Sequence, residues 1–78
     1  MNEHRPIHII AQEIYHDWRK PNYAAKPYLE AMLSLDSIKD MYLMDSARSV
    51  VAYFLGNAST WKGETARRIK KELKGMMK

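Results

Sequence analysis

The sequence predicts a single all-α domain over residues 1–78, a compact bundle of about four helices at 7–19, 23–35, 46–55 and 60–76. Apolar residues recur mostly at the three- and four-residue spacing of a helix instead of alternating as in a strand. A length of 78 residues suits one domain. No glycine-rich linker, internal repeat or low-complexity tract divides the chain.

The first predicted helix begins after Pro6, since proline is tolerated in the first turn, where its missing N–H is not needed. Pro21 ends the segment because it disfavours helical geometry at Lys20. A helical stripe of apolar residues lies between them: Ile7, Ile10, Ala11, Ile14 and Trp18.

The second predicted helix is apolar over roughly 200° of its circumference, so we expect it to be the central and most buried one. Asn22 is a residue type that favours the N-cap position. Pro27 falls late for a helix that starts there, which favours a start nearer Lys26. The main apolar residues are Tyr28, Leu29, Met32 and Leu33.

Two further helical stripes follow. Asp45 or Ser46 caps the third helix, and Gly56 ends it. Ser59 or Thr60 caps the fourth. The third stripe consists of Ala47, Val50, Val51, Phe54 and Leu55, and the fourth of Trp61, Thr65, Ile69, Leu73 and Met76.

We expect the four stripes to converge on one core that Trp18 and Trp61 bracket. Leu33 belongs to that core on this interpretation, and Leu33→Ala is expected to cost about 2–5 kcal/mol. The residues predicted to be almost fully buried are Leu29, Met32, Leu33, Val51, Phe54 and Ile69.

The positive charge is concentrated at the C-terminus. Residues 1–60 carry six Lys or Arg against seven Asp or Glu, whereas residues 61–78 carry seven against two. Arg68 is expected to be neutralised by Glu64 and Glu72, one turn away on either side. Five other cations share one arc of the last helix, here called the basic ridge: Arg67, Lys70, Lys71, Lys74 and Lys78.

The basic ridge has two interpretations. It is either a solvated helix face or a contact for an anion, which means nucleic-acid phosphate or an acidic protein surface. Phosphate binding is mostly electrostatic and independent of sequence, so a ridge of this kind suffices for weak binding. Base specificity would need side chains aimed at base edges.

Two half-motifs suggest a helix-turn-helix. Residues 51–56 resemble its first helix and turn, and residues 64–73 resemble the recognition helix of winged-helix regulators. Eight positions separate Gly56 from Glu64, about four more than the usual turn allows. The alternative function is therefore a small helix-turn-helix-like DNA- or RNA-binding protein using the basic C-terminal helix. The residues expected to read bases are Glu64, Thr65 and Arg68.

An apolar run, Met41-Tyr42-Leu43-Met44, stands in a predicted loop between two aspartates. It is either a lid tucked over the core or a surface for a partner protein, for which Met and Tyr suit adaptable packing. Tyr53 points away from its helix's apolar stripe. The residues predicted to contact a partner protein on the second interpretation are therefore Met41, Tyr42, Met44 and Tyr53.

No motif indicates catalysis, a metal or a cofactor. His8 and His16 are two turns apart, roughly 12 Å along a helix, too far to share one ion. With no cysteine there is no thiol nucleophile, and no serine has an evident base and orienting acid. We expect a non-enzymatic protein without a metal or cofactor. The longest apolar run, at residues 50–55, has six residues, so no membrane role is expected.

Nearly the whole chain from His8 to Met77 resembles a group of small orphan proteins of bacteriophages and other mobile elements. This resemblance implies an accessory protein that binds a host protein or nucleoprotein complex without catalysis, in the cytoplasm of a bacterial host. An anti-defence or anti-CRISPR-like inhibitor is one such role. The segments that carry the resemblance are 10–14, 17–18, 23–32, 35–38, 53–55 and 57–70.

Overall fold

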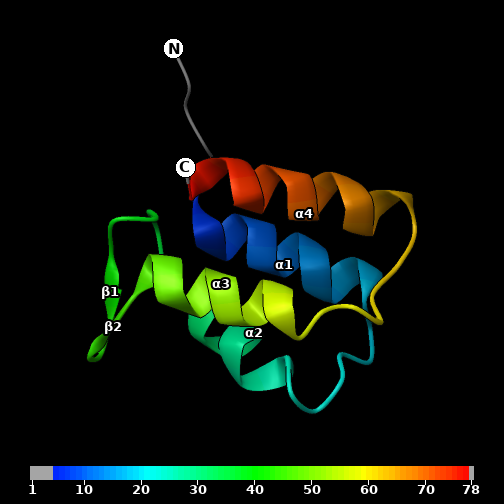
Figure 1. The fold of residues 1–78 in the computed structure, drawn as a ribbon, viewed down its shortest axis with the longest axis horizontal. Helices are drawn as coiled ribbons and strands as arrows, with labels where there is room; N and C mark the ends of the chain where they lie inside the picture. The colour runs from blue at the N-terminus through cyan, green and yellow to red at the C-terminus, as the bar shows by residue number, and fades with distance from the viewer. Residues whose placement is uncertain (1–4, 78) are drawn as a thin grey trace.

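Four helices and one two-stranded antiparallel hairpin form the fold in the computed structural model, which describes residues 5–77 (Figure 1). The four expected helices are present. The hairpin is a departure from the all-α prediction, so the fold is mostly helical. The elements in chain order are α1 (Ile7–Asp17), α2 (Lys26–Met32), β1 (Met41–Tyr42), β2 (Asp45–Ser46), α3 (Ala47–Gly56) and α4 (Glu64–Met76).

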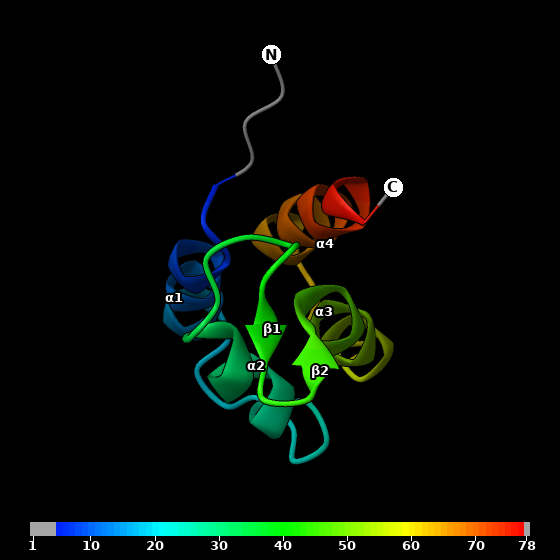
Figure 2. The same cartoon turned by 90° about the vertical axis from the view of Figure 1, so that its left-hand side faces the viewer.

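The helices surround a common centre when the molecule is viewed end-on (Figure 2). Helix α1 packs against α2 and α4, and α3 packs against α2. The hairpin, the start of α1 and the end of α4 lie at one end of the molecule, whereas the connections before α2 and α4 lie at the other (Figure 1). Two opposite ends and the outer helix faces are therefore available to partners.

Most of the predicted core is buried as expected. Leu29, Met32, Val51, Phe54 and Ile69 are fully buried. The exception is Leu33, which is 40% exposed. Helix α2 ends at Met32 and Leu33 is its C-cap, so the chain has already begun to turn there. The next buried residue is Leu35, and the prediction for Leu33 is wrong.

The two tryptophans stack on each other instead of bracketing the core. Their ring centroids are 5.6 Å apart with an interplanar angle of 9°. The Phe54 ring lies 6.3 Å from each of them. Trp61 is buried, and its indole N–H donates a 2.8 Å hydrogen bond to the Asp17 carboxylate. This aromatic cluster joins the end of α1 to α3 and to the connection before α4.

The boundaries of the first three helices differ from the prediction by a few residues. Helix α1 ends at Asp17, and α2 begins at Lys26. Asn22 caps the turn before α2, where its side-chain oxygen accepts from the Ala25 N–H. The predicted cap of α3 is confirmed, since the Ser46 hydroxyl accepts from the Ser49 N–H.

Helix α4 begins four residues later than predicted, at Glu64. Gly63 precedes it with φ of 115°, in the region that favours glycine. Because Trp61 is buried in the aromatic cluster, residues 60–63 lie outside the helix. Neither Ser59 nor Thr60 caps α4, and that prediction is wrong.

The predicted loop at residues 41–44 is part of the hairpin. Met41 pairs with Ser46 and Tyr42 pairs with Asp45, which leaves Leu43 and Met44 as a two-residue turn. The backbone N–H of Ala47 donates to the Asp40 carbonyl and holds the base of the hairpin at the start of α3. Among the helices of residues 5–77, none has the length and apolar character to cross a membrane.

Candidate binding surfaces

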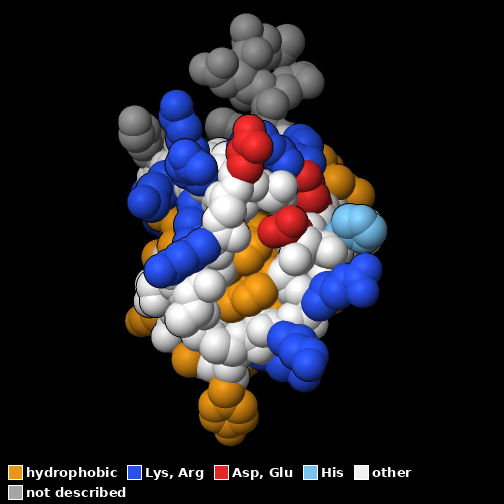
Figure 3. Space-filling view, turned by 90° about the vertical axis from the view of Figure 1, so that its right-hand side faces the viewer, with side chains coloured by type: hydrophobic (Ala, Val, Ile, Leu, Met, Phe, Trp, Pro, Cys, Tyr) orange, Lys and Arg blue, Asp and Glu red, His pale blue; other side chains and the backbone are white. Residues whose placement is uncertain are grey.

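Three members of the basic ridge lie exposed on α4: Arg67, Lys71 and Lys74. In the described part of the chain, no ion pair involves any of them. Figure 3 views the molecule from the right-hand side of Figure 1. It shows a group of Lys and Arg side chains at the upper left, on the side of α4. Lys78, the last predicted member, lies outside the described residues.

Lys70 has a different role from its neighbours. Its ammonium group donates 2.7 Å hydrogen bonds to the carbonyls of Ala58 and Trp61. It also lies 5.8 Å from the centroid of the Trp61 ring. Burial, followed by the neighbouring charges of Lys74 and Lys62, lowers the pKa of Lys70. Lys70 therefore holds the α3–α4 connection, and the exposed ridge is narrower than predicted.

Replacing Lys70 by methionine should lower the free energy of unfolding by about 1–3 kcal/mol, because two carbonyls lose a charged donor. The matched variant Lys71→Met should change it by less than about 0.5 kcal/mol, since Lys71 is exposed. Urea denaturation of both variants measures the difference. Equal small effects would mean that Lys70 is as free as its neighbours.

Arg68 pairs with a carboxylate on another helix, and not with the glutamates of its own helix as predicted. Its guanidinium contacts Glu13 on α1 instead of Glu64 and Glu72. Glu72 receives two hydrogen bonds from Arg5, at 2.9 and 2.7 Å. Arg5 also lies 2.9 Å from the Glu13 carboxylate. Two arginines and two glutamates thus join the start of the described chain, α1 and α4 in one network.

The network shifts the pKa values of Glu13 and Arg5. The hydrogen bond from Arg68, and then that from Arg5, lowers the pKa of Glu13, and the carboxylate of Glu72 raises the pKa of Arg5. Because the pKa of Glu13 is lowered, its ionised form stabilises the fold at neutral pH. That contribution is lost as the pH falls through the folded-state pKa. The network therefore has a structural role.

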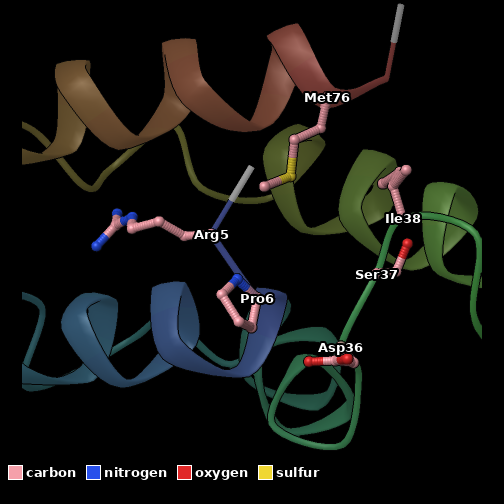
Figure 4. Close-up of a pocket in the computed structure, with 6 residues that line it drawn as sticks. All are labelled: Arg5, Pro6, Asp36, Ser37, Ile38 and Met76. Atoms are coloured by element: carbon pink, nitrogen blue, oxygen red, sulfur yellow. The ribbon is translucent and has the colours of Figure 1, made fainter. Parts of the chain in front are cut away.

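A small hollow of about 260 Å³ lies beside this network, between the start of α1, residues 36–38 and the end of α4. The Arg5 side chain extends away from Asp36 and Ser37, as Figure 4 shows. Its guanidinium is already held by carboxylates. Among residues 5–77, this hollow therefore offers no free cation to an anionic ligand.

The turn of the hairpin is apolar and projects into solvent. Leu43 is 83% exposed and Met44 is 92% exposed. Met41 is exposed as well, whereas Tyr42 is half-buried against the core. Of the residues in the apolar run 41–44, only Tyr42 therefore packs over the core as a lid would. Leu43 was missed as a contact candidate, although it stands within the predicted apolar run.

Leu43 has an unusual backbone for its residue type. Its φ is +56°, the only positive φ of a non-glycine residue among residues 5–77. Two-residue hairpin turns favour Asn, Asp or Gly because these residues tolerate this region. Leucine carries a steric cost there. An exposed leucine in this conformation contributes nothing evident to the fold.

Tyr53 lies exposed on α3, as predicted. Its ring stacks on Tyr28 of α2, with centroids 5.4 Å apart. The pair borders the hairpin: a hollow lined by both rings is also lined by Tyr42. Two of the predicted protein-contact residues, Tyr42 and Tyr53, therefore share one surface, formed by α2, α3 and the hairpin.

Residues 5–77 bring together no group of three or more His, Asp or Glu that could hold a metal ion. His8 lies with Nδ1 3.2 Å from the Leu35 carbonyl and 3.7 Å from the Asp36 carboxylate. The hydroxyls of Ser46 and Ser49 form a hydrogen bond with each other, 3.1 Å long. None of these pairs includes both a nucleophile and a base.

No protein-family model, no curated protein and no solved structure matches this chain.

Proposed function

We propose that this protein acts by non-catalytic binding to another protein and that the hairpin turn is its main contact. One observation carries the proposal: Leu43 and Met44 are exposed in a turn whose backbone disfavours leucine. Residues whose backbone conformation conflicts with the preference of their type, and which do not stabilise the fold, are expected at functional sites. Apolar side chains at the tip of a narrow hairpin suit insertion into a pocket of a partner.

The resemblance to orphan phage proteins supports a context for this binding. The partner would be a component of a host macromolecular complex in the bacterial cytoplasm. An inhibitor of a defence complex is one form of such a protein. The Met and Tyr content of the surface supports the choice of a protein partner, because these residue types are enriched at interfaces.

The test is capture of a partner from nuclease-treated bacterial lysate, compared between matched variants. In Leu43→Asn with Met44→Ser, the turn receives residues that it tolerates, so the fold should be kept and its stability should rise by up to about 1 kcal/mol. Capture should nevertheless be lost, since removing hot-spot residues weakens binding by about 30-fold or more. Wild-type capture by this variant would contradict the proposal.

The control variant carries Arg67→Glu and Lys71→Glu on the basic ridge. It should capture the partner as the wild type does once nucleic acid has been digested. If capture instead disappears on nuclease treatment and in this control variant, nucleic-acid binding replaces protein binding as the function.

The exposed ridge favours that second candidate, a small DNA- or RNA-binding protein. Arg67, Lys71 and Lys74 offer about three phosphate contacts, so the slope of log affinity against log salt would be about −2.7 for duplex DNA. Of the expected base readers, Arg68 is paired with Glu13. Seven residues, 57–63, separate α3 from α4. These features support weak, sequence-independent binding over helix-turn-helix recognition.

A further inference from the structure

A groove of about 590 Å³ lies between α2, α3 and the hairpin. Its volume falls within the range of ligand-binding clefts. Three tyrosines, one from each of these elements, line it together with two carboxylates. These five residues are Tyr28, Tyr42, Tyr53, Glu30 and Asp45.

The lining of the groove is negative in a chain whose net charge is +4. Of the residues that the structure describes, Glu30 and Asp45 line it, and no Lys, Arg or His does. Within residues 5–77 neither carboxylate takes part in an ion pair. The groove therefore has an electrostatic preference for a cation, opposite to that of the basic ridge.

The tyrosines indicate which class of cation fits the groove. The rings of Tyr28 and Tyr53 are stacked, and Tyr42 stands opposite Asp45 in the hairpin. Aromatic faces attract cations, and the planar guanidinium of arginine stacks on them while donating paired hydrogen bonds to a carboxylate. A quaternary ammonium has no N–H to give to these carboxylates. A lysine ammonium is compact and strongly hydrated, and it does not stack.

We infer that this groove binds an arginine side chain of the partner protein. The inference rests on the proposed function, because it names the chemistry of the surface that the hairpin meets. Tyr42 and Asp45 directly flank the Leu43–Met44 turn. A partner that buries the turn therefore covers the adjoining groove, and an arginine beside its apolar pocket reaches the tyrosines and carboxylates.

The experiment is a titration of the ¹⁵N-labelled full chain, followed by NMR, with N-acetyl-arginine methylamide. The matched probes are the lysine and norleucine derivatives and tetramethylammonium. Shift changes should concentrate at the groove residues. The arginine derivative should bind about tenfold more tightly than the norleucine derivative, because a charged hydrogen bond contributes at least that factor.

Glu30→Gln with Asp45→Asn should weaken arginine binding about tenfold, since both groups lose their charge. The control Asp36→Asn removes an exposed carboxylate from a different hollow and should leave binding unchanged. Both replaced groove carboxylates are exposed, so the variants should keep the amide dispersion of the wild type.

Three outcomes would overturn the inference. The norleucine derivative or tetramethylammonium could bind as tightly as the arginine derivative, or the double variant could bind the arginine derivative as tightly as the wild type does. These results are independent of the capture experiment with the turn variants. Loss of capture in the turn variant with no arginine binding would reject the groove proposal alone. Arginine binding with capture unaffected by the turn variant would reject the hairpin as the main contact.

Discussion

Phe54→Ala is expected to lower the free energy of unfolding by about 3–5 kcal/mol. Phe54 is fully buried, and its ring packs against both Trp18 and Trp61. Truncation leaves a cavity at the point where α1, α3 and the α3–α4 connection meet. A domain of this length has a total stability of about 4–12 kcal/mol, so the variant should lose a quarter or more of its stability.

The neighbouring residue provides the control for this prediction. Tyr53 is exposed, and its ring contacts Tyr28 at the surface. Tyr53→Ala should therefore cost only about 0.5–1.5 kcal/mol. Urea denaturation followed by tryptophan fluorescence measures both variants, because the stacked tryptophans report directly on the cluster. A cost for Phe54→Ala as small as that for Tyr53→Ala would show that the cluster does not support the core.

Helical periodicity predicted the core well because packing of an apolar stripe dominates helix formation in proteins. The stripes of α1 and α3 place Ile10, Ile14, Val51 and Phe54 in the interior, where the structure has them. The cap at Ser46 was also predictable, since a serine before an apolar stripe satisfies a free N–H of the first turn.

The hairpin was not predictable from local chemistry. Hairpin signals are turn residues such as Asn-Gly between alternating strands, and the turn here is Leu43–Met44. Its strands have two residues each, too few to show a period. One further backbone hydrogen bond, from the Ala47 N–H to the Asp40 carbonyl, closes its base.

Tertiary contacts also decided which cations of α4 remain free. The angular position of Lys70 on the helix is that of a ridge residue, but the carbonyls of Ala58 and Trp61 lie within its reach. Arg68 has two glutamates at favourable spacing on its own helix, yet it contacts Glu13 on α1. A helical wheel contains no information on such partners, because they depend on how the helices pack.

Met32→Ala should lower the free energy of unfolding by about 2–5 kcal/mol, whereas Leu33→Ala should cost about 1 kcal/mol or less. The two residues are adjacent, apolar and similar in size, so the comparison isolates burial. Met32 is fully buried at the end of α2, and Leu33 is 40% exposed at its C-cap.

The sequence pattern, which extends the second helix to residue 35, places both side chains in the core and predicts equal losses. Chemical denaturation of the two variants therefore distinguishes the two positions for the end of α2. Each variant should keep the helical circular-dichroism signal before the transition, and the midpoint should fall strongly for Met32→Ala alone. A comparably large loss for Leu33→Ala would mean that α2 continues beyond Met32 and that Leu33 faces the core.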